Sequence, residues 1–137
     1  MPHQGQCLCG SSKIIIHSTK TKQDICHCTD CQHISGSAFG SSISVNESDV
    51  EITGDEIREF HSKAANGNPV TRVFCGKCGS SLAQKGAYFR GTIAIQTGNL
   101  PDFRMIPYGE EIFVKDRWEA LSPVPGAKQV DGMPTRD

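Results

Sequence analysis

Seven cysteines in three clusters carry the chemistry that this sequence can do. They occur as Cys7-Leu-Cys9-Gly10, Cys26-His-Cys28-Thr-Asp-Cys31 and Cys75-Gly-Lys-Cys78-Gly79. Each cluster sets thiolates at tight spacing beside small or turn-forming residues, which is the pattern of zinc-binding knuckles. A glycine in the turn lets backbone N–H groups approach the negatively charged sulfurs. We therefore predict zinc ligands rather than disulfides.

The division of the cysteines between metal ions decides what each site can do. Two doublets, Cys7 with Cys9 and Cys75 with Cys78, would make a closed site of four thiolates, which is structural. This four-cysteine cluster leaves the cysteine triplet, formed by Cys26, Cys28 and Cys31, with an open fourth position. Three protein ligands and an open position are typical of catalytic zinc. A rival division joins Cys28 and Cys31 with Cys75 and Cys78, and it leaves three thiols unused.

The open position of the triplet has a second interpretation. A histidine, His33 or His27, could close the site and make it structural. His27 directly follows Cys26, so its side chain is expected to point away from a metal that Cys26 and Cys28 share. His33 could reach such a metal only if the backbone turns sharply.

Three thiolates restrict the chemistry of an open zinc site. Together with Zn²⁺ they carry a net charge of about −1, so the metal is a weak Lewis acid that favours exchange of a soft fourth ligand. A thiol with a free pKa of roughly 8.5 would ionise readily there. The thiolate can then add to a small aldehyde. The triplet therefore predicts formation or breakdown of an S-hydroxymethyl thiol adduct.

The residues after the triplet are candidates for substrate binding. Ser35 and Ser37 offer hydroxyl groups, and Gly36 would allow close approach of the backbone. The alternative is that all three only form the loop after a helical turn. A neighbouring base could be His27 or His33.

Short strands must position these residues, so the predicted fold class is mainly β, a single zinc-stapled domain with one or two short helical turns. β-Branched and alternating patterns predict strands at 13–17, 41–45, 49–53, 56–62, 71–75, 81–85, 91–98 and 111–115, with a turn between the second and third. A helical turn is expected at 29–35, with Thr29 or Asp30 near its N-cap and Gly36 ending it. Phe60 is expected to face inward, and Trp118 and Leu121 are expected to anchor the core.

Length and composition indicate one domain that needs metal to fold. In 137 residues, large aliphatic and aromatic side chains are sparse, so burial alone would leave the fold marginal. A structural zinc adds roughly 10 kcal/mol or more of apparent folding free energy. We expect the zinc-binding domain to span 1–122 and an irregular, loosely attached tail to span 123–137.

Charge and hydropathy exclude several classes of partner. Lys and Arg number 14 against 15 for Asp and Glu, which does not favour nucleic acid. The longest aliphatic run is III at 14–16, so no membrane segment or signal peptide is expected. Persistent thiols indicate a reducing compartment, and a cytoplasmic location is expected. The sequence does not indicate an oligomeric state.

The cysteine motifs GQCLCG, CHCTDCQHISGSAF and RVFCGKCGSSL, in this order, resemble the family of glutathione-dependent formaldehyde-activating enzymes, which includes centromere protein V. The resemblance continues through GTIAIQTGNL and EIFVKDRWEAL, so it covers nearly the whole chain. It implies a structural zinc on the first and third clusters and a catalytic zinc on the middle triplet, two zinc ions per chain. For the fold it implies strongly coiled β-sheets, a β-tent.

The resemblance also implies an activity. It is that of a carbon–sulfur lyase which forms S-(hydroxymethyl)glutathione from glutathione and formaldehyde. Glu111 stands where many relatives have a histidine, and residues 101–108 lack an acidic pair often present there, so the substrate could differ. The alternatives are a related zinc lyase acting on another metabolite and a non-catalytic, zinc-stabilised binding module.

Overall fold

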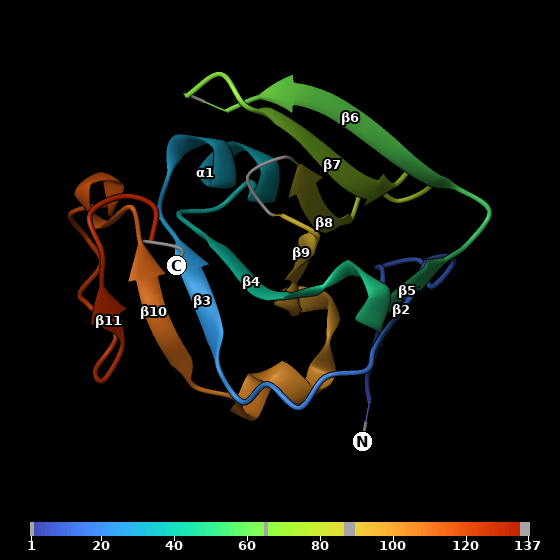
Figure 1. The fold of residues 1–137 in the computed structure, drawn as a ribbon, viewed down its shortest axis with the longest axis horizontal. Helices are drawn as coiled ribbons and strands as arrows, with labels where there is room; N and C mark the ends of the chain where they lie inside the picture. The colour runs from blue at the N-terminus through green and yellow to red at the C-terminus, as the bar shows by residue number, and fades with distance from the viewer. Residues whose placement is uncertain (1, 65, 87–89, 135–137) are drawn as a thin grey trace.

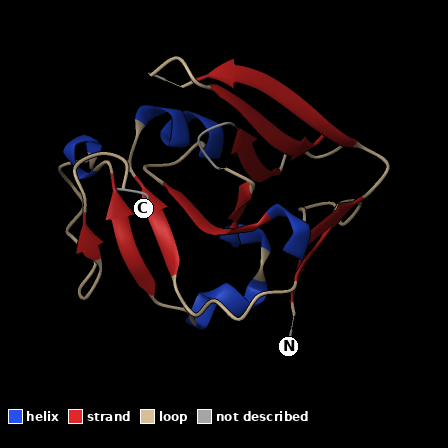
Figure 2. Cartoon of the chain, viewed as in Figure 1, coloured by secondary structure: helices blue, strands red, loops and turns tan. Residues whose placement is uncertain are grey.

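The structure is a computed structural model, which describes residues 2–64, 66–86 and 90–134. In this part of the chain, two β-sheets form the fold. The smaller sheet has the order β1-β2-β5 and consists of β1 (His3–Gln6), β2 (Lys13–Ile16) and β5 (Val50–Thr53). Both of its pairings are antiparallel. The chain is mainly β, as predicted, and strands dominate both views of it (Figures 1 and 2).

The larger sheet has eight strands in the order β11-β10-β3-β4-β9-β8-β7-β6. Its strands are β3 (Gln23–Cys26), β4 (Gly40–Asn46), β6 (Ile57–Lys63), β7 (Pro69–Cys75), β8 (Ser81–Gly86), β9 (Thr92–Gln96), β10 (Tyr108–Ile112) and β11 (Lys128–Gln129). β10 pairs in parallel with β3 and with β11, whereas the other pairings are antiparallel. The sheet curves so strongly that its two ends stand on either side of α1 (Figure 1).

Aliphatic side chains of both sheets form one core between them. Ile14 and Ile16 alternate with the half-buried Ile15 on β2, which shows the period of a strand with one buried face. They pack with side chains of β4, β8 and β9, among them Ile43, Leu82 and Ile95. The core therefore joins the two sheets.

The helix α1 (Thr29–Ser35) begins and ends on residues that define its shape. Its N-cap is Cys28, whose sulfur accepts a hydrogen bond from the Cys31 N–H. Thr29 and Asp30, which were expected near the N-cap, are the first two residues of the helix. Gly36 ends the helix in the left-handed conformation with φ 64°, as predicted. Short 3₁₀ helices connect other strands: η1 (Glu47–Asp49), η3 (Thr97–Asn99), η4 (Pro101–Met105) and η5 (Val114–Asp116).

Several strand predictions need correction. The strands expected at 41–45 and 49–53 are β4 and β5, with η1 as the turn between them, and they belong to different sheets. The strand expected at 111–115 ends at residue 112, since a 3₁₀ turn follows it. β1, β3 and β11 were not predicted, because they are short and carry few β-branched residues.

Two expected core residues lie on the surface. Phe60 is 60% exposed, because β6 is an edge strand whose central residues are uncovered on both faces. Trp118 is 51% exposed, and Leu121 is only half-buried. Among the described residues, the core is mostly aliphatic, with Phe103, Cys7 and Cys75 as its other members.

The segment from Pro123 to Pro134 is bound to the larger sheet. It contains β11, and the Val130 N–H donates to the Glu111 carbonyl at 2.9 Å. The division of the chain at residue 122 stays a prediction, and 135–137 lie outside the described residues. No helix in the described part of the chain is long and apolar enough to cross a membrane.

Candidate metal centres

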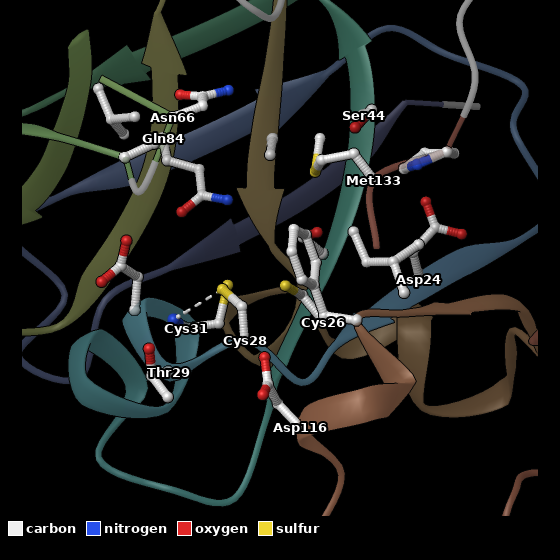
Figure 3. Close-up of a pocket in the computed structure, with 18 of the residues that line it drawn as sticks. Asp24, Cys26, Cys28, Thr29, Cys31, Ser44, Asn66, Gln84, Asp116 and Met133 are labelled. Carbon is white, nitrogen blue, oxygen red and sulfur yellow. Dashed lines mark hydrogen bonds between the residues drawn. The ribbon is translucent and has the colours of Figure 1, made fainter. Parts of the chain in front are cut away.

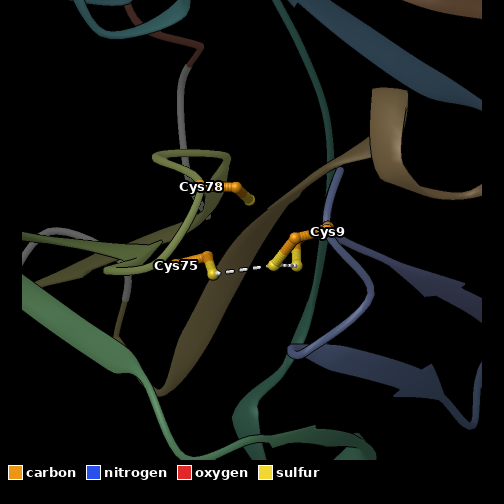
Figure 4. A group of neighbouring side chains, drawn as sticks. Cys9, Cys75 and Cys78 are labelled. Atoms are coloured by element: carbon orange, nitrogen blue, oxygen red, sulfur yellow. Dashed lines mark hydrogen bonds between the residues drawn. The ribbon is translucent and has the colours of Figure 1, made fainter.

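The four-cysteine cluster assembles from two turns that are distant in the sequence. The sulfur atoms of Cys7, Cys9, Cys75 and Cys78 all lie within 4.8 Å of one another (Figure 4). The Cys7–Cys9 and Cys9–Cys75 sulfur distances are 3.6 and 3.8 Å. A tetrahedral zinc with bonds of about 2.3 Å would hold its sulfurs about 3.8 Å apart, so the arrangement fits zinc. The rival division does not fit, because Cys28 and Cys31 lie in a separate group.

Tight turns and polar groups support these four sulfurs. Gly10 and Gly79 both have φ 82°, and their N–H groups donate to the carbonyls of Cys7 and Cys75. The Ser11 hydroxyl lies 3.4 Å from the Cys75 sulfur, and this contact, with the neighbouring Ser12 hydroxyl, lowers the pKa of Cys75 to about 5. This stabilisation of a thiolate before any metal binds is what a metal ligand needs.

The cysteine triplet is built where β3 meets α1. Cys26 is the last residue of β3, Cys28 caps the helix and Cys31 lies in its first turn, so that the three sulfurs converge within 4.8 Å. The Cys31 N–H donates to the Cys28 sulfur at 3.4 Å. Among the described residues, no histidine, carboxylate or further cysteine joins this group. His33 is exposed and lies outside it.

The three close thiols cannot all ionise without a cation. Hydrogen bonds from Cys26 and Cys31 lower the pKa of Cys28 to about 2. The pKa of Cys26 is raised, first by Cys28 and Cys31 and then by burial. For Cys31, Cys26 lowers the pKa, but Cys28 and burial outweigh that effect and raise it to about 12. A divalent cation would offset these charges, and a soft donor set of this kind fits zinc.

The triplet opens into a cavity of about 640 Å³. Both ends of the larger sheet contribute to its walls, through β7 with Ala64, Asn66 and Asn68 on one side and through β10, η5 and Met133 on the other. Figure 3 shows Asn66 and Gln84 on one side of the cysteines and Asp24 and Met133 on the other. The four-cysteine cluster does not line this cavity.

The three residues predicted to bind substrate are not among the lining residues. The Ser35 hydroxyl donates to the Cys31 carbonyl at 2.7 Å, and the Ser37 hydroxyl donates to the Phe39 carbonyl at 2.7 Å. Gly36 supplies the left-handed C-cap of α1. These contacts favour the loop-forming role, and a role in substrate binding stays a prediction.

A family model described as "Glutathione-dependent formaldehyde-activating enzyme" matches residues 2–116. The chain belongs to this family. A Rhodobacter sphaeroides protein of known crystal structure has the same fold, with a TM-score of 0.59, 15% sequence identity, and coverage of 77% of this chain and 98% of that one. A comparison with curated proteins finds no match.

In this member of the glutathione-dependent formaldehyde-activating family, a buried hydrogen-bonded pair of side chains lies beside the triplet. His27, between two of the cysteines, contacts the Glu111 carboxylate through Nε2 at 2.8 Å, and both side chains are 2% exposed. Burial alone would raise the pKa of Glu111, but hydrogen bonds from Gln129, His27 and the Val124 N–H, with the Arg117 charge, lower it to about 2. His27 therefore points away from the triplet, as expected.

Sequence reasoning missed Glu111 as a partner of His27, and it missed Arg72. Arg72 lies three residues before Cys75, is buried, and lines the cavity beside the triplet. Charged residues beside apolar strand residues were the available signal in both cases, since VTRVF carries one arginine and EEIFV begins with two glutamates. The cavity is also lined by the carboxyl of Asp24, whose pKa burial and the Glu110 charge raise to about 6.

Proposed function

We propose that this protein is a zinc-dependent carbon–sulfur lyase that forms or breaks an adduct between a thiol and a small aldehyde. Glutathione and formaldehyde are the leading pair, with S-(hydroxymethyl)glutathione as the adduct. The observation that carries the proposal is the triplet itself, which offers three sulfur ligands and faces a cavity of about 640 Å³. Membership of the glutathione-dependent formaldehyde-activating family supports the same reaction.

Two zinc ions per chain follow from the donor sets. Cys7, Cys9, Cys75 and Cys78 would hold the structural ion, and the triplet would hold the other. When bound at the triplet, zinc would lower the pKa of a thiol that coordinates it, so that the thiol is ionised at neutral pH. Thiol ligands that must stay reduced suit a reducing compartment, such as the cytoplasm.

The residues of the chain supply positioning. In the forward direction the thiolate sulfur bonds to the carbonyl carbon, and the carbonyl oxygen takes up a proton. Holding the thiol in a fixed place makes this addition effectively unimolecular, which supplies much of the acceleration. Neither His27 nor His33 lines the cavity, whereas the carboxyl groups of Asp24 and Asp116 do. The proton therefore comes from a carboxyl group of the cavity or from water.

The size of the cavity favours a thiol that is larger than its partner. A pocket of several hundred Å³ is typical of sites that bind ligands of drug size. Formaldehyde fills a small part of such a space, so the remaining volume is available to the body of the thiol. This agrees with glutathione as the thiol.

The test is an assay of the zinc-loaded protein with glutathione and formaldehyde, in which NMR measures the rate of adduct formation and exchange. We expect wild type to exceed the spontaneous rate and Cys28→Ser to return to it. His33→Ala, which alters an exposed residue outside the triplet, should retain the wild-type rate. Zinc content measured in parallel should fall from two to one per chain in Cys28→Ser.

Two results would contradict the proposal at different levels. If wild type leaves the spontaneous rate unchanged with this pair but accelerates another thiol and aldehyde, the substrate assignment fails. If no pair is accelerated although both metal ions are present, the protein is a zinc-stabilised binding module rather than a lyase.

A further inference from the structure

Arg72 is a buried cation on the wall of the cavity that holds the triplet. It lies on β7, and its side chain is 10% exposed. The other cationic side chains that line the cavity, Lys63 and Lys115, are both exposed. A guanidinium buried beside a cavity needs anionic or hydrogen-bonding partners, since burial of an uncompensated charge is costly.

Among the described residues, the anionic groups that face Arg72 are the Cys31 sulfur, whose charged form the Arg72 charge stabilises, and the Asp30 carboxylate. One guanidinium nitrogen, Nη1, donates to the side-chain carbonyl of Gln84, which is neutral. The other, Nη2, lies 4.0 Å from the Asp30 carboxylate, whose side chain is 51% exposed. An exposed carboxylate at this distance contributes little. Because a guanidinium has five donors in a planar fork, Arg72 retains capacity for another anion.

Arg72 and Gln84 are built as a pair. They lie opposite each other in the register of β7 and β8, and both line the cavity. Since the Gln84 carbonyl accepts from Arg72, its amide N–H₂ remains available as a neighbouring donor. An arginine beside an amide donor is a favourable partner for a planar carboxylate.

The rest of the cavity would direct a carboxylate to this pair. Asp24 and Glu110 face each other on β3 and β10, and both line the cavity. Figure 3 shows Gln84 and Asp24 on opposite sides of the cysteines. The Asp24 and Glu110 carboxylates repel an anion on their side, and on the other side the buried cation Arg72 outweighs the exposed carboxylate of Asp30, so an anionic ligand is favoured to lie toward Arg72.

We infer that the Arg72–Gln84 pair binds a carboxylate of the thiol whose sulfur reaches the triplet, so that the cavity selects carboxylate-bearing thiols over neutral ones. This inference rests on the proposed function, because it assumes that a thiol enters the triplet. It goes further, because it names the class of substrate and the residues that bind the carboxylate of that substrate. A cavity of about 640 Å³ has room for both ends of such a ligand.

The test compares two thiols that differ in one charge, 3-mercaptopropionate and its methyl ester. Their binding to the zinc-loaded protein is measured by titration calorimetry. We expect the acid to bind wild type about tenfold more tightly than the ester, as for a hydrogen bond to a charged group. Arg72→Met should lower the affinity for the acid to that for the ester and leave the affinity for the ester unchanged. Arg104→Met, the same change at an exposed position outside the cavity, should leave both affinities unchanged.

A second variant keeps the arginine and removes its free charge. Gln84→Glu sets a carboxylate beside the guanidinium, and it should abolish the preference for the acid even if Arg72→Met folds poorly. Equal binding of acid and ester to wild type would overturn the inference and leave the proposed function standing. An equal loss of affinity for both thiols in Arg72→Met would also overturn the inference, because Arg72 would then act only on the charge of the triplet. If neither thiol binds wild type, the proposed function fails as well.

Discussion

Glu111 joins three parts of the chain that lie far apart in the sequence. Its carboxylate accepts from the Val124 N–H and the Gln129 amide, each at 2.7 Å, and it contacts His27 at 2.8 Å. A buried carboxylate with this many donors is stabilised in its charged form. One side chain thus fixes the segment between two metal-binding cysteines and holds the C-terminal segment against it.

Replacing Glu111 by Gln should reveal this role through pH. Because the folded pKa of about 2 lies below the ordinary value of 4.5, the contribution of Glu111 is complete above pH 4.5 and is lost as the pH falls through about 2. We expect Glu111→Gln to lower the free energy of unfolding by about 2 kcal/mol at pH 7, with the difference from wild type vanishing near pH 2. Urea unfolding of both proteins at each pH measures this difference. Loss of metal in acid lowers the stability of both proteins, so it cancels in the difference.

Glu119→Gln provides the control, since Glu119 is exposed. Its stability should equal that of wild type at every pH. A Glu111→Gln variant as stable as wild type at pH 7, or a difference that grows in acid, would contradict the role of this carboxylate.

At the scale of elements, α1 and β4 meet at two glycines with different tasks. Gly36 ends the helix at φ 64°, and a methyl group added there would meet nothing within 4 Å. Gly40 begins β4 opposite Cys26, and a methyl group there would lie 3.3 Å from Cys31 Cβ and 3.6 Å from its sulfur. The first glycine shapes the backbone, and the second makes room for a metal ligand.

Alanine substitutions at Gly36 and at Gly40 should therefore differ in their effects on folding stability and on metal release. Gly36→Ala should destabilise the fold by about 1 kcal/mol through backbone strain while the triplet keeps its metal. Gly40→Ala should displace the Cys31 sulfur and speed the release of the triplet metal to a chelator, with a smaller effect on folding. Release rates followed with a metal indicator, beside thermal unfolding, measure both effects. Faster release from Gly36→Ala than from Gly40→Ala would contradict this assignment.

Local signals predicted the helix and most strands, while long-range pairings escaped prediction. The bounds of α1 at 29–35 and its end at Gly36 follow from turn chemistry that is readable in the sequence. β3, which carries Asp24 and Cys26, has only four residues and owes its place to pairing with β4 and β10. Nothing local marks such a strand. The cysteine clusters were predictable because ligand spacing is local, whereas the walls of the cavity come from both ends of the sheet.

At the scale of the whole molecule, the two candidate metal centres differ in which parts of the fold they would hold together. The four-cysteine cluster links the turn between β1 and β2 to the turn between β7 and β8, and therefore joins the two sheets. The triplet lies at the junction of β3 and α1, on the wall of a cavity. Loss of the first ion should separate sheets, while loss of the second should leave them packed.

Treatment with a chelator should consequently release the metal in two stages. We expect the triplet ion to leave first with the far-UV circular dichroism unchanged, and the second ion to leave only as the protein unfolds. A metal indicator and circular dichroism recorded together follow both stages. Simultaneous loss of both ions, or a single ion in the fully loaded protein, would argue against an open and a closed site.

The parallel pairing of β10 with β3 also sets an order of assembly during translation. His27 and its partner Glu111 are 84 residues apart, which the ribosome covers in roughly 4 to 17 s at 5–20 residues per second. The triplet therefore leaves the ribosome well before the strand that buries its neighbouring histidine. Metal can therefore reach these three cysteines on a nascent chain before β10 and η5 complete the cavity.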